Sequence, residues 1–306
     1  MVEKIIVGSR GSRLAVIQAQ EVIDGLRRID ANLNIELKTI KTEGDRDRNT
    51  SLTVLGGRGV FVKEIEDALL RGDIDIAVHS LKDMPTDTPP GQRIAATLER
   101  LDPRDVLVSP HGGLSKLPPG ARIGTGSQRR SVQLLSMCPE VEIVDLRGNI
   151  DTRLRKCDSG QVDGVLMAAA ALIRSGLSDE ITEYLPFETF TPAVGQGALG
   201  IEIRRGDGII EELVVPLNHA PTMAAVIAER AFLRALGGGC QEPIAALGVV
   251  EGASLRVRGM VADSASGETM YAGVEGGVAD AEALGKRLAR EMIEMGAERL
   301  IGRCGS

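Results

Sequence analysis

The chain has 306 residues, 43% of them hydrophobic and 26% charged, a composition that can bury a core. At ~100–200 residues per domain, this length predicts two or three domains. It contains no run of about 18 apolar residues, so no membrane span is expected. The first residues enter a strand-like run without the basic and long apolar segments of a signal peptide, and we expect a cytoplasmic protein.

The charge balance is mildly acidic, with a formal net charge of −7. A general nucleic-acid binder would show a basic excess, so this class is disfavoured. Of the 36 basic residues, 28 are Arg. The Arg fork grips carboxylate or phosphate with two parallel hydrogen bonds, so the arginines indicate an anionic ligand. A GC-rich genome, which favours Arg codons, explains the composition equally well.

Cysteine, histidine and aromatic residues are few and scattered. The four Cys and three His residues form no C-x-x-C pair or cluster, which argues against a disulfide framework and against a zinc site. No metal is therefore expected. The chain has no Trp, two Tyr and four Phe, so platforms for stacking nucleic-acid bases are not expected either.

The pattern of the first two hundred residues alternates between strands and helices, which predicts two α/β units. In the first unit we expect strands at 4–9, 34–42 and 74–78 and helices at 14–29 and 61–71. The polar, Gly-rich segment 43–59 is typical of a lid or a disordered loop. In the second unit, which begins near residue 102, we expect strands at 122–125, 142–146 and 164–167 and helices at 127–137 and 150–156.

The two units resemble each other at two places, in the same order. Residues 7–13 are similar to residues 123–129, and residues 72–78 are similar to residues 160–166. This favours twin α/β domains. The rest of the chain predicts a third, α+β domain from about residue 218, after a strand at 200–204. There we expect a helix at 223–236, strands at 245–250 and 255–262, a Gly-rich turn, and a helix at 281–295.

Two predicted strand–turn–helix junctions carry the first chemical signal, because a helix N-terminus exposes unpaired N–H groups that attract anions. Ser12 and Ser127 stand at these helix starts, where each can cap the helix or donate to an anion. Four arginines stand beside the same openings: Arg10, Arg13, Arg129 and Arg130. For either junction alone, ordinary capping with solvated arginines is the simpler interpretation. Further arginines follow in the second unit, namely Arg147, Arg153 and Arg174.

Two other segments are candidates for chemistry. Lys82 and Asp83 follow a predicted buried strand, where an acid and a base are well placed for proton transfer, although such a pair is more often a solvated turn. His79, in the same segment, is by default a packing or hydrogen-bonding residue. Cys240 follows three glycines, which suits an exposed thiolate nucleophile or attachment point. A buried inert Cys is the plainer alternative.

These segments resemble those of the porphobilinogen deaminase family. The similarity covers residues 236–245, 77–85, 8–15, 57–64, 146–149 and 192–197, and it runs in order from residue 4 to about 250. It implies two periplasmic-binding-protein-like (type II) α/β domains and a small α+β C-terminal domain. The implied boundaries are 1–99 with 200–217, 100–199, and 218–306, the last carrying Cys240.

The resemblance also implies the reaction. In this family four porphobilinogen molecules condense head to tail, each losing ammonia, and water releases hydroxymethylbilane. The primer is a dipyrromethane, held here by a thioether to Cys240. Asp83 matches the catalytic aspartate, with Lys82 beside it. The residues matched to cofactor binding are Cys240, Ser80, Thr125, Ser127, Arg129, Arg130, Arg147 and Gly148. Those matched to substrate binding are Arg10, Ser12, Gln18, Arg58, Arg153, Arg174 and Gln196.

Two positions depart from the family pattern. Many relatives have Lys where this chain has Arg58, and many have Ser where it has Gly126. We expect a change of contacts more than of chemistry. The family also suggests a monomer with a small-molecule substrate and neither nucleic-acid nor membrane partners. A non-catalytic solute-binding module is the competing hypothesis, because it too would show twin α/β domains and an arginine-lined cleft.

Overall fold

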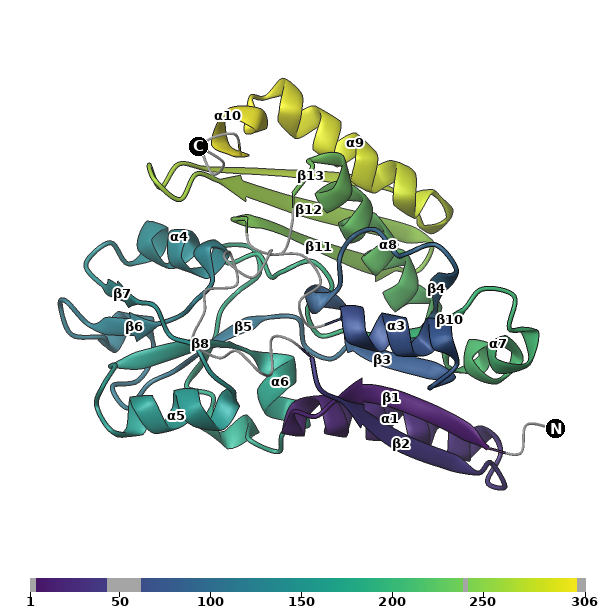
Figure 1. Ribbon diagram of the computed structural model, residues 1–306. Helices are drawn as coiled ribbons and strands as arrows, with labels where there is room; N and C mark the ends of the chain where they lie inside the picture. Colours follow the sequence, from purple (N-terminus) through teal and green to yellow (C-terminus); the bar gives the residue numbers. More distant parts are fainter. Residues whose placement is uncertain (1–3, 43–61, 239–241, 302–306) are drawn as a thin grey trace.

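The computed structural model describes residues 4–42, 62–238 and 242–301, which form three β-sheets with their covering helices (Figure 1). The first sheet has the order β2-β1-β3-β10-β4. Its strands are β1 (Ile5–Arg10), β2 (Ile35–Ile40), β3 (Ile76–Ser80), β4 (Gln92–Thr97) and β10 (Leu199–Arg204). The first three are parallel, whereas β10 runs antiparallel to both of its neighbours. A strand from far along the chain therefore completes the sheet built by the first hundred residues.

The second sheet repeats this plan with the order β7-β6-β8-β5-β9. Its strands are β5 (Asp105–Val108), β6 (Arg122–Gly124), β7 (Glu142–Val144), β8 (Gly164–Ala168) and β9 (Glu183–Tyr184). Strands β6, β7 and β8 are parallel, and β5 is antiparallel to β8 and β9. The chain passes between the two sheets twice, once from β4 to β5 and once from β9 to β10. Residues 185–198 of the second passage are called the return segment below.

The helices of these two units cover the sheets and present their N-termini at strand ends. They are α1 (Arg13–Ile29), α3 (Lys63–Arg71), α4 (Gln128–Met137), α5 (Ile150–Asp158), α6 (Ala169–Arg174) and α7 (Gly208–Val214). Helix α1 buries Ala19, Val22, Ile23 and Leu26, a spacing that places them on one face against the first sheet. Ser12 caps α1 by accepting from the Ala15 N–H, so its predicted capping role is confirmed.

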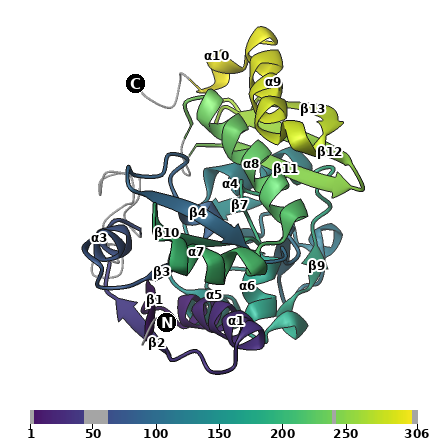
Figure 2. The ribbon, with the colours of Figure 1, turned by 90° about the vertical axis from the view of Figure 1, so that its right-hand side faces the viewer.

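The C-terminal unit is an antiparallel sheet of β11 (Ile244–Glu251), β12 (Ser254–Ala262) and β13 (Thr269–Gly277), covered by helices. These helices are α8 (Ala220–Ala235), α9 (Ala281–Glu294) and α10 (Ala297–Ile301). Figures 1 and 2 both place α9 at the end of the molecule opposite α1 and β2. The described residues also form short 3₁₀ helices at Leu81–Asp83, Leu114–Lys116, Ser178–Glu180, Val215–Leu217 and Val278–Asp280.

The expected fold class is confirmed: two mixed five-stranded α/β units and a small α+β unit. One expectation was wrong, since the Gly-rich stretch before residue 281 is the strand β13 and not a turn. The glycine at position 276 of this strand is explained by packing, because a Cβ there would lie 2.7 Å from the Leu284 Cδ2 of α9. Segment 43–59, predicted as a lid or disordered loop, lies outside the described residues. No helix of the described chain is long and apolar enough to cross a membrane.

Candidate active site

The segment after β3 has buried apolar side chains that hold it in place, and it has polar side chains that are more exposed. Leu81 and Met84 are 1% and 2% exposed and pack in an apolar cluster beneath the segment. The Leu81 N–H also donates to the Ala198 carbonyl of the return segment at 3.1 Å. Between these anchors, Lys82 is half-buried and Asp83 is exposed. The short turn therefore presents a carboxylate and an ammonium group while its apolar residues fix the backbone.

A cavity opens beside Asp83 at the N-terminus of α1. Its polar lining includes Arg10, Ser12, Gln18, His79, Ser80 and Asp83. The Gln18 Nε2 donates to the Ser80 Oγ at 2.8 Å, which fixes both side chains at the wall. Five residues that the sequence assigned to the site, all of these except His79, thus meet in one place. The cavity offers a cation, hydroxyl donors and a carboxylate to the same ligand.

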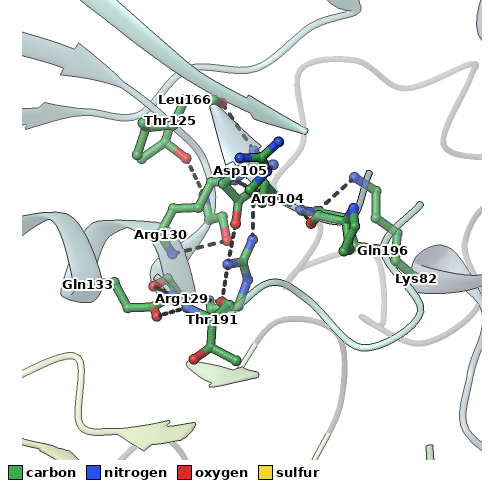
Figure 3. A network of polar contacts seen from close by, with 12 residues as sticks. Lys82, Arg104, Asp105, Thr125, Arg129, Arg130, Gln133, Leu166, Thr191 and Gln196 are labelled. Atoms are coloured by element: carbon green, nitrogen blue, oxygen red, sulfur yellow. Dashed lines mark hydrogen bonds and ion pairs between the residues drawn. The ribbon is translucent and has the colours of Figure 1, made fainter. Parts of the chain in front are cut away.

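The N-terminus of α4 is organised around a buried carboxylate, that of Asp105 on β5 (Figure 3). The Arg129 Nη1 donates to Asp105 Oδ2 at 2.7 Å, and the Arg130 Nε donates to Asp105 Oδ1 at 2.8 Å. Asp105 is fully buried, and the two arginines are 5% and 7% exposed. Burial alone would raise the pKa of Asp105, but the two guanidinium groups outweigh it and hold that pKa well below its usual range.

Gln196 of the return segment links this cluster to the turn of Leu81–Asp83. Its Nε2 donates to the Pro103 carbonyl at 2.8 Å and to Asp105 Oδ1 at 3.1 Å, while its Oε1 accepts from the Lys82 Nζ at 3.5 Å. Figure 3 shows Gln196 between Lys82 and Asp105. Burial lowers the pKa of Lys82 to about 8, and the neighbouring carboxylate of Asp83 offsets only part of this effect. The two α/β units therefore share one polar network next to Asp83.

Three further predicted residues lie at the starts of α4 and α5. Ser127 caps α4 by accepting from the Arg130 N–H, which confirms its capping role, and the Thr125 Oγ1 accepts from the Ser127 N–H at 3.2 Å. Gly148, with φ +118°, accepts from the Arg153 Nε at 3.0 Å. Gly148 adopts a backbone conformation that L side chains rarely take, and this places its carbonyl at the turn.

Positive charge gathers beside these helix starts. Burial and the neighbouring charge of Arg130 lower the pKa of Arg153 to about 10. Arg147 acts in the same direction, although Asp145 opposes it. The Arg147 Nε donates to Asp145 Oδ2 at 3.4 Å, a pair that is largely open to water. At Arg153, the charges of Arg130 and Arg147 together thus outweigh that of Asp145, an arrangement that favours a bound anion there.

Arg174 lies apart from this group. Its Nε donates to both carboxylate oxygens of Glu21 at 3.1–3.2 Å, and its Nη2 donates to the Gly197 carbonyl at 3.2 Å. The side chain is 3% exposed and ties α6 to α1 across the two units. Its assignment to substrate binding stays a prediction. Arg58 and Cys240 lie outside the described residues, and their roles stay predictions as well.

Asp105 is the residue that sequence reasoning missed. Its two arginine partners lie 24 and 25 residues further along the chain, so no local spacing marks the interaction. The only signal was its place just after the boundary between the two predicted units. A fully buried carboxylate needs compensating charge, and the paired arginines of α4 supply it.

Family models and known proteins match nearly all of the chain. The family model for the porphobilinogen deaminase dipyromethane cofactor binding domain matches residues 5–212, and that for the C-terminal domain matches residues 223–294. This chain belongs to the porphobilinogen deaminase family. It is 49% identical over 299 residues to the porphobilinogen deaminase of Moorella thermoacetica, covering 97% of this chain and 96% of the relative. The relative from Pelotomaculum thermopropionicum is 46% identical over 304 residues, covering 99% and 97%.

Among solved structures, a periplasmic sulfonate-binding protein from Methylobacillus flagellatus has a TM-score of 0.39 and 14% identity, covering 77% of this chain and 68% of that one.

The residues of this porphobilinogen deaminase family member fit the cofactor named by its family model. A dipyrromethane built from porphobilinogen carries an acetate and a propionate on each ring, so it brings four carboxylates. Arg147 and Arg153 place positive charge at the start of α5, and the carboxylate that pairs with Arg147, that of Asp145, is 67% exposed. Hydroxyl groups of Ser80 and Ser12 line the neighbouring cavity. The described site therefore supplies the charge and the donors that such a ligand needs.

The buried cluster predicts a specific effect on stability. Asp105→Asn removes the charge that balances two buried guanidinium groups, and breaking a buried pair in this way costs about 3–5 kcal/mol. We expect this loss in the free energy of unfolding measured by urea denaturation. Asp145→Asn is the matched control, because its carboxylate is 67% exposed, and we expect a loss of about 0–1 kcal/mol. Equal losses in the two variants would contradict the role given to Asp105.

Proposed function

We propose that this chain is a hydroxymethylbilane synthase, a transferase of tetrapyrrole biosynthesis. It condenses four porphobilinogen molecules head to tail with loss of ammonia, on a dipyrromethane primer attached to Cys240. The single observation that carries the proposal is the juxtaposition of Asp83 with a cavity whose walls offer the cation of Arg10 and hydroxyl donors. Family membership over nearly the whole chain supports the same reaction.

The chain's own groups divide between holding the ligand and promoting the reaction. When bound, the dipyrromethane supplies the pyrrole carbon from which the product is extended. Ser80, Thr125, Ser127, Arg129, Arg130, Arg147 and Gly148 would hold it, with Cys240 as its point of attachment. Arg10, Ser12, Gln18, Arg58, Arg153, Arg174 and Gln196 would bind the incoming substrate. Bidentate contacts from arginine fix the orientation of each ring as well as its charge.

Asp83 is proposed as the catalytic residue. The departure of ammonia and the formation of the new bond place positive charge on pyrrole nitrogens. A fixed carboxylate beside those N–H groups stabilises that charge, an effect worth several kcal/mol in a preorganised site. The buried anchors Leu81 and Met84 hold the turn rigid, so little reorganisation is needed as the charge develops. Lys82 would bind a carboxylate of the substrate with its ammonium group.

We also propose the domain division 1–99 with 200–217, 100–199, and 218–306. The pairing of β10 with β3 and β4 supports the assignment of residues 200–217 to the first domain. A monomeric, cytoplasmic enzyme with no nucleic-acid partner completes the proposal. Its net charge of −7 supports the last point.

The attachment of the primer gives a direct prediction for the intact mass of the purified protein. We expect an excess over the sequence mass equal to one dipyrromethane, because the thioether survives denaturation. The matched variant Cys240→Ser removes the sulfur and should show the sequence mass alone, whereas Cys138→Ser keeps the excess. Mass spectrometry of the three proteins makes the comparison. An unmodified and fully active wild-type protein would contradict the proposal.

The role of Asp83 predicts a large loss of turnover. Asp83→Asn keeps the shape of the side chain but removes its charge, and we expect the rate of hydroxymethylbilane formation to fall by about 10²–10⁴-fold with the primer still attached. Asp87→Asn is the control, since this exposed carboxylate lies four residues further and pairs with Arg234. Substantial activity in the Asp83 variant would remove that residue from the centre of the reaction.

The lowered pKa of Lys82 predicts a pH dependence of substrate binding. Lys82 carries its charge below about pH 8 and loses it as the pH rises through that value. The KM for porphobilinogen should therefore rise between about pH 7 and pH 9, measured from steady-state rates. Lys82→Arg keeps the charge over this whole range and should flatten the rise. The same pH profile of KM in both proteins would refute this role.

A further inference from the structure

A buried polar group lies behind the Asp83 cavity, between helix α3 and the first sheet. The His79 Nε2 lies 3.1 Å from Glu202 Oε2, with the two side chains 4% and 0% exposed. Glu66 of α3 is 8% exposed. One imidazole and two carboxylates are therefore withdrawn from water, and the imidazole lines the Asp83 cavity.

The three side chains share one face of the sheet. Ala77 packs with Ile65 of α3, and in a strand the side chain of His79, two residues on, points to the same face. Glu202 stands opposite Ala77 in the antiparallel pairing of β10 with β3, so its side chain also faces α3. The surrounding layer is apolar, which makes each uncompensated charge in it costly.

The group has more acceptors than donors. Glu66 Oε1, Glu202 Oε1 and Gln92 Oε1 are buried and have no hydrogen-bond partner among the residues that the structure describes. With both carboxylates ionised, a single imidazolium could balance only one of them. A proton held within the group would satisfy one of these acceptors and would also remove the excess negative charge.

Glu66 is the residue of this group whose protonated form is favoured by its surroundings. Burial and the charge of Glu202 raise the pKa of Glu66 to about 7. His79 on β3 opposes the shift and Asp67 on the same helix adds to it. On β10, the guanidinium of Arg204 also lies against α3, where it donates to the Leu69 carbonyl, and on β4 the uncharged amide of Gln92 donates to the Glu66 carbonyl. Near neutral pH the group therefore gains and loses a proton readily.

The proposed reaction takes up one proton and gives up another in every condensation. The C–N bond of the aminomethyl group breaks, and the nitrogen takes up a proton and leaves as ammonia. A carbon–carbon bond then forms, and the attacked ring carbon gives up its proton. The two transfers balance, but they occur at different atoms and at different times. Asp83 is exposed to water, whereas His79, Glu202 and Glu66 are buried.

We propose that His79, Glu202 and Glu66 form a buried proton store behind the Asp83 cavity. The store gives up one proton as ammonia leaves and recovers one after the new carbon–carbon bond has formed. His79 lines the same cavity as Asp83 and is the member through which the proton enters and leaves. This inference rests on the proposed function, and the experiments below separate the two.

The decisive variant is Glu66→Gln, which keeps the side-chain volume and removes the titrating proton. We expect kcat to fall about tenfold or more, with KM within about twofold, because no substrate contact is lost. In the wild type kcat should fall as the pH rises above about 7, because Glu66 then loses its proton. The carboxylates of the bound ligand should move the pH of this fall upward. The variant should show no such fall in kcat. Glu211→Gln is the control, a carboxylate of α7 that pairs with Arg93 at the surface.

Infrared spectroscopy of the wild-type protein adds a readout that does not depend on the variant's folding. The carbonyl stretch of a protonated carboxylic acid should titrate near pH 7 and be absent from Glu66→Gln. Absence of this titration from the wild type would overturn the store, as would a kcat–pH profile unchanged in a folded Glu66→Gln. In either case wild-type turnover leaves the proposed function standing. A wild type that forms no hydroxymethylbilane from porphobilinogen would overturn the function itself.

Discussion

The buried carboxylate of Asp105 is the interaction on which the rest of the site depends. It compensates two guanidinium groups, those of Arg129 and Arg130, that are almost completely withdrawn from water. A single carboxylate accepts from both arginines and from Gln196, which leaves little freedom to any of them. The N-terminus of α4, the return segment and the turn of Leu81–Asp83 are consequently fixed relative to one another. Arg147 and Arg153, which are less buried, add positive charge at the start of α5.

A second buried carboxylate extends this arrangement to the C-terminal unit. Glu229 of α8 accepts from Arg100 and from the Gly195 N–H of the return segment, at 2.5 and 2.7 Å. It also accepts from the Gly248 N–H of β11 at 2.8 Å. The helix that leads toward Cys240 is thus tied to the passages between the two sheets. Charge–charge contacts hold the three units around one region, while separate apolar clusters give each unit its own core.

Local features of the site were predictable from the sequence, and long-range ones were not. Ser12 and Ser127 stand next to the helices they cap, so the pattern of a strand, a turn and a polar residue sufficed to place them. The pairing of Arg174 with Glu21 joins residues 153 positions apart, and nothing in either neighbourhood announces it. The membership of β10 in the first sheet came from the family resemblance and not from periodicity. Strand β13 was missed because glycines are typical of turns, whereas here Gly276 serves close packing against Leu284 of α9.

The central claim is that a polyanionic ligand, held by the cations of this site, is extended beside the carboxylate of Asp83. A crystal structure of the purified protein with its cofactor tests this most directly. We expect a carboxylate oxygen of Asp83 to accept from a pyrrole N–H at about 3 Å, with the contacts of Asp105 to Arg129 and Arg130 retained. Pyrrole rings bound away from Asp83, in a site that shares no wall with the cavity, would contradict the account.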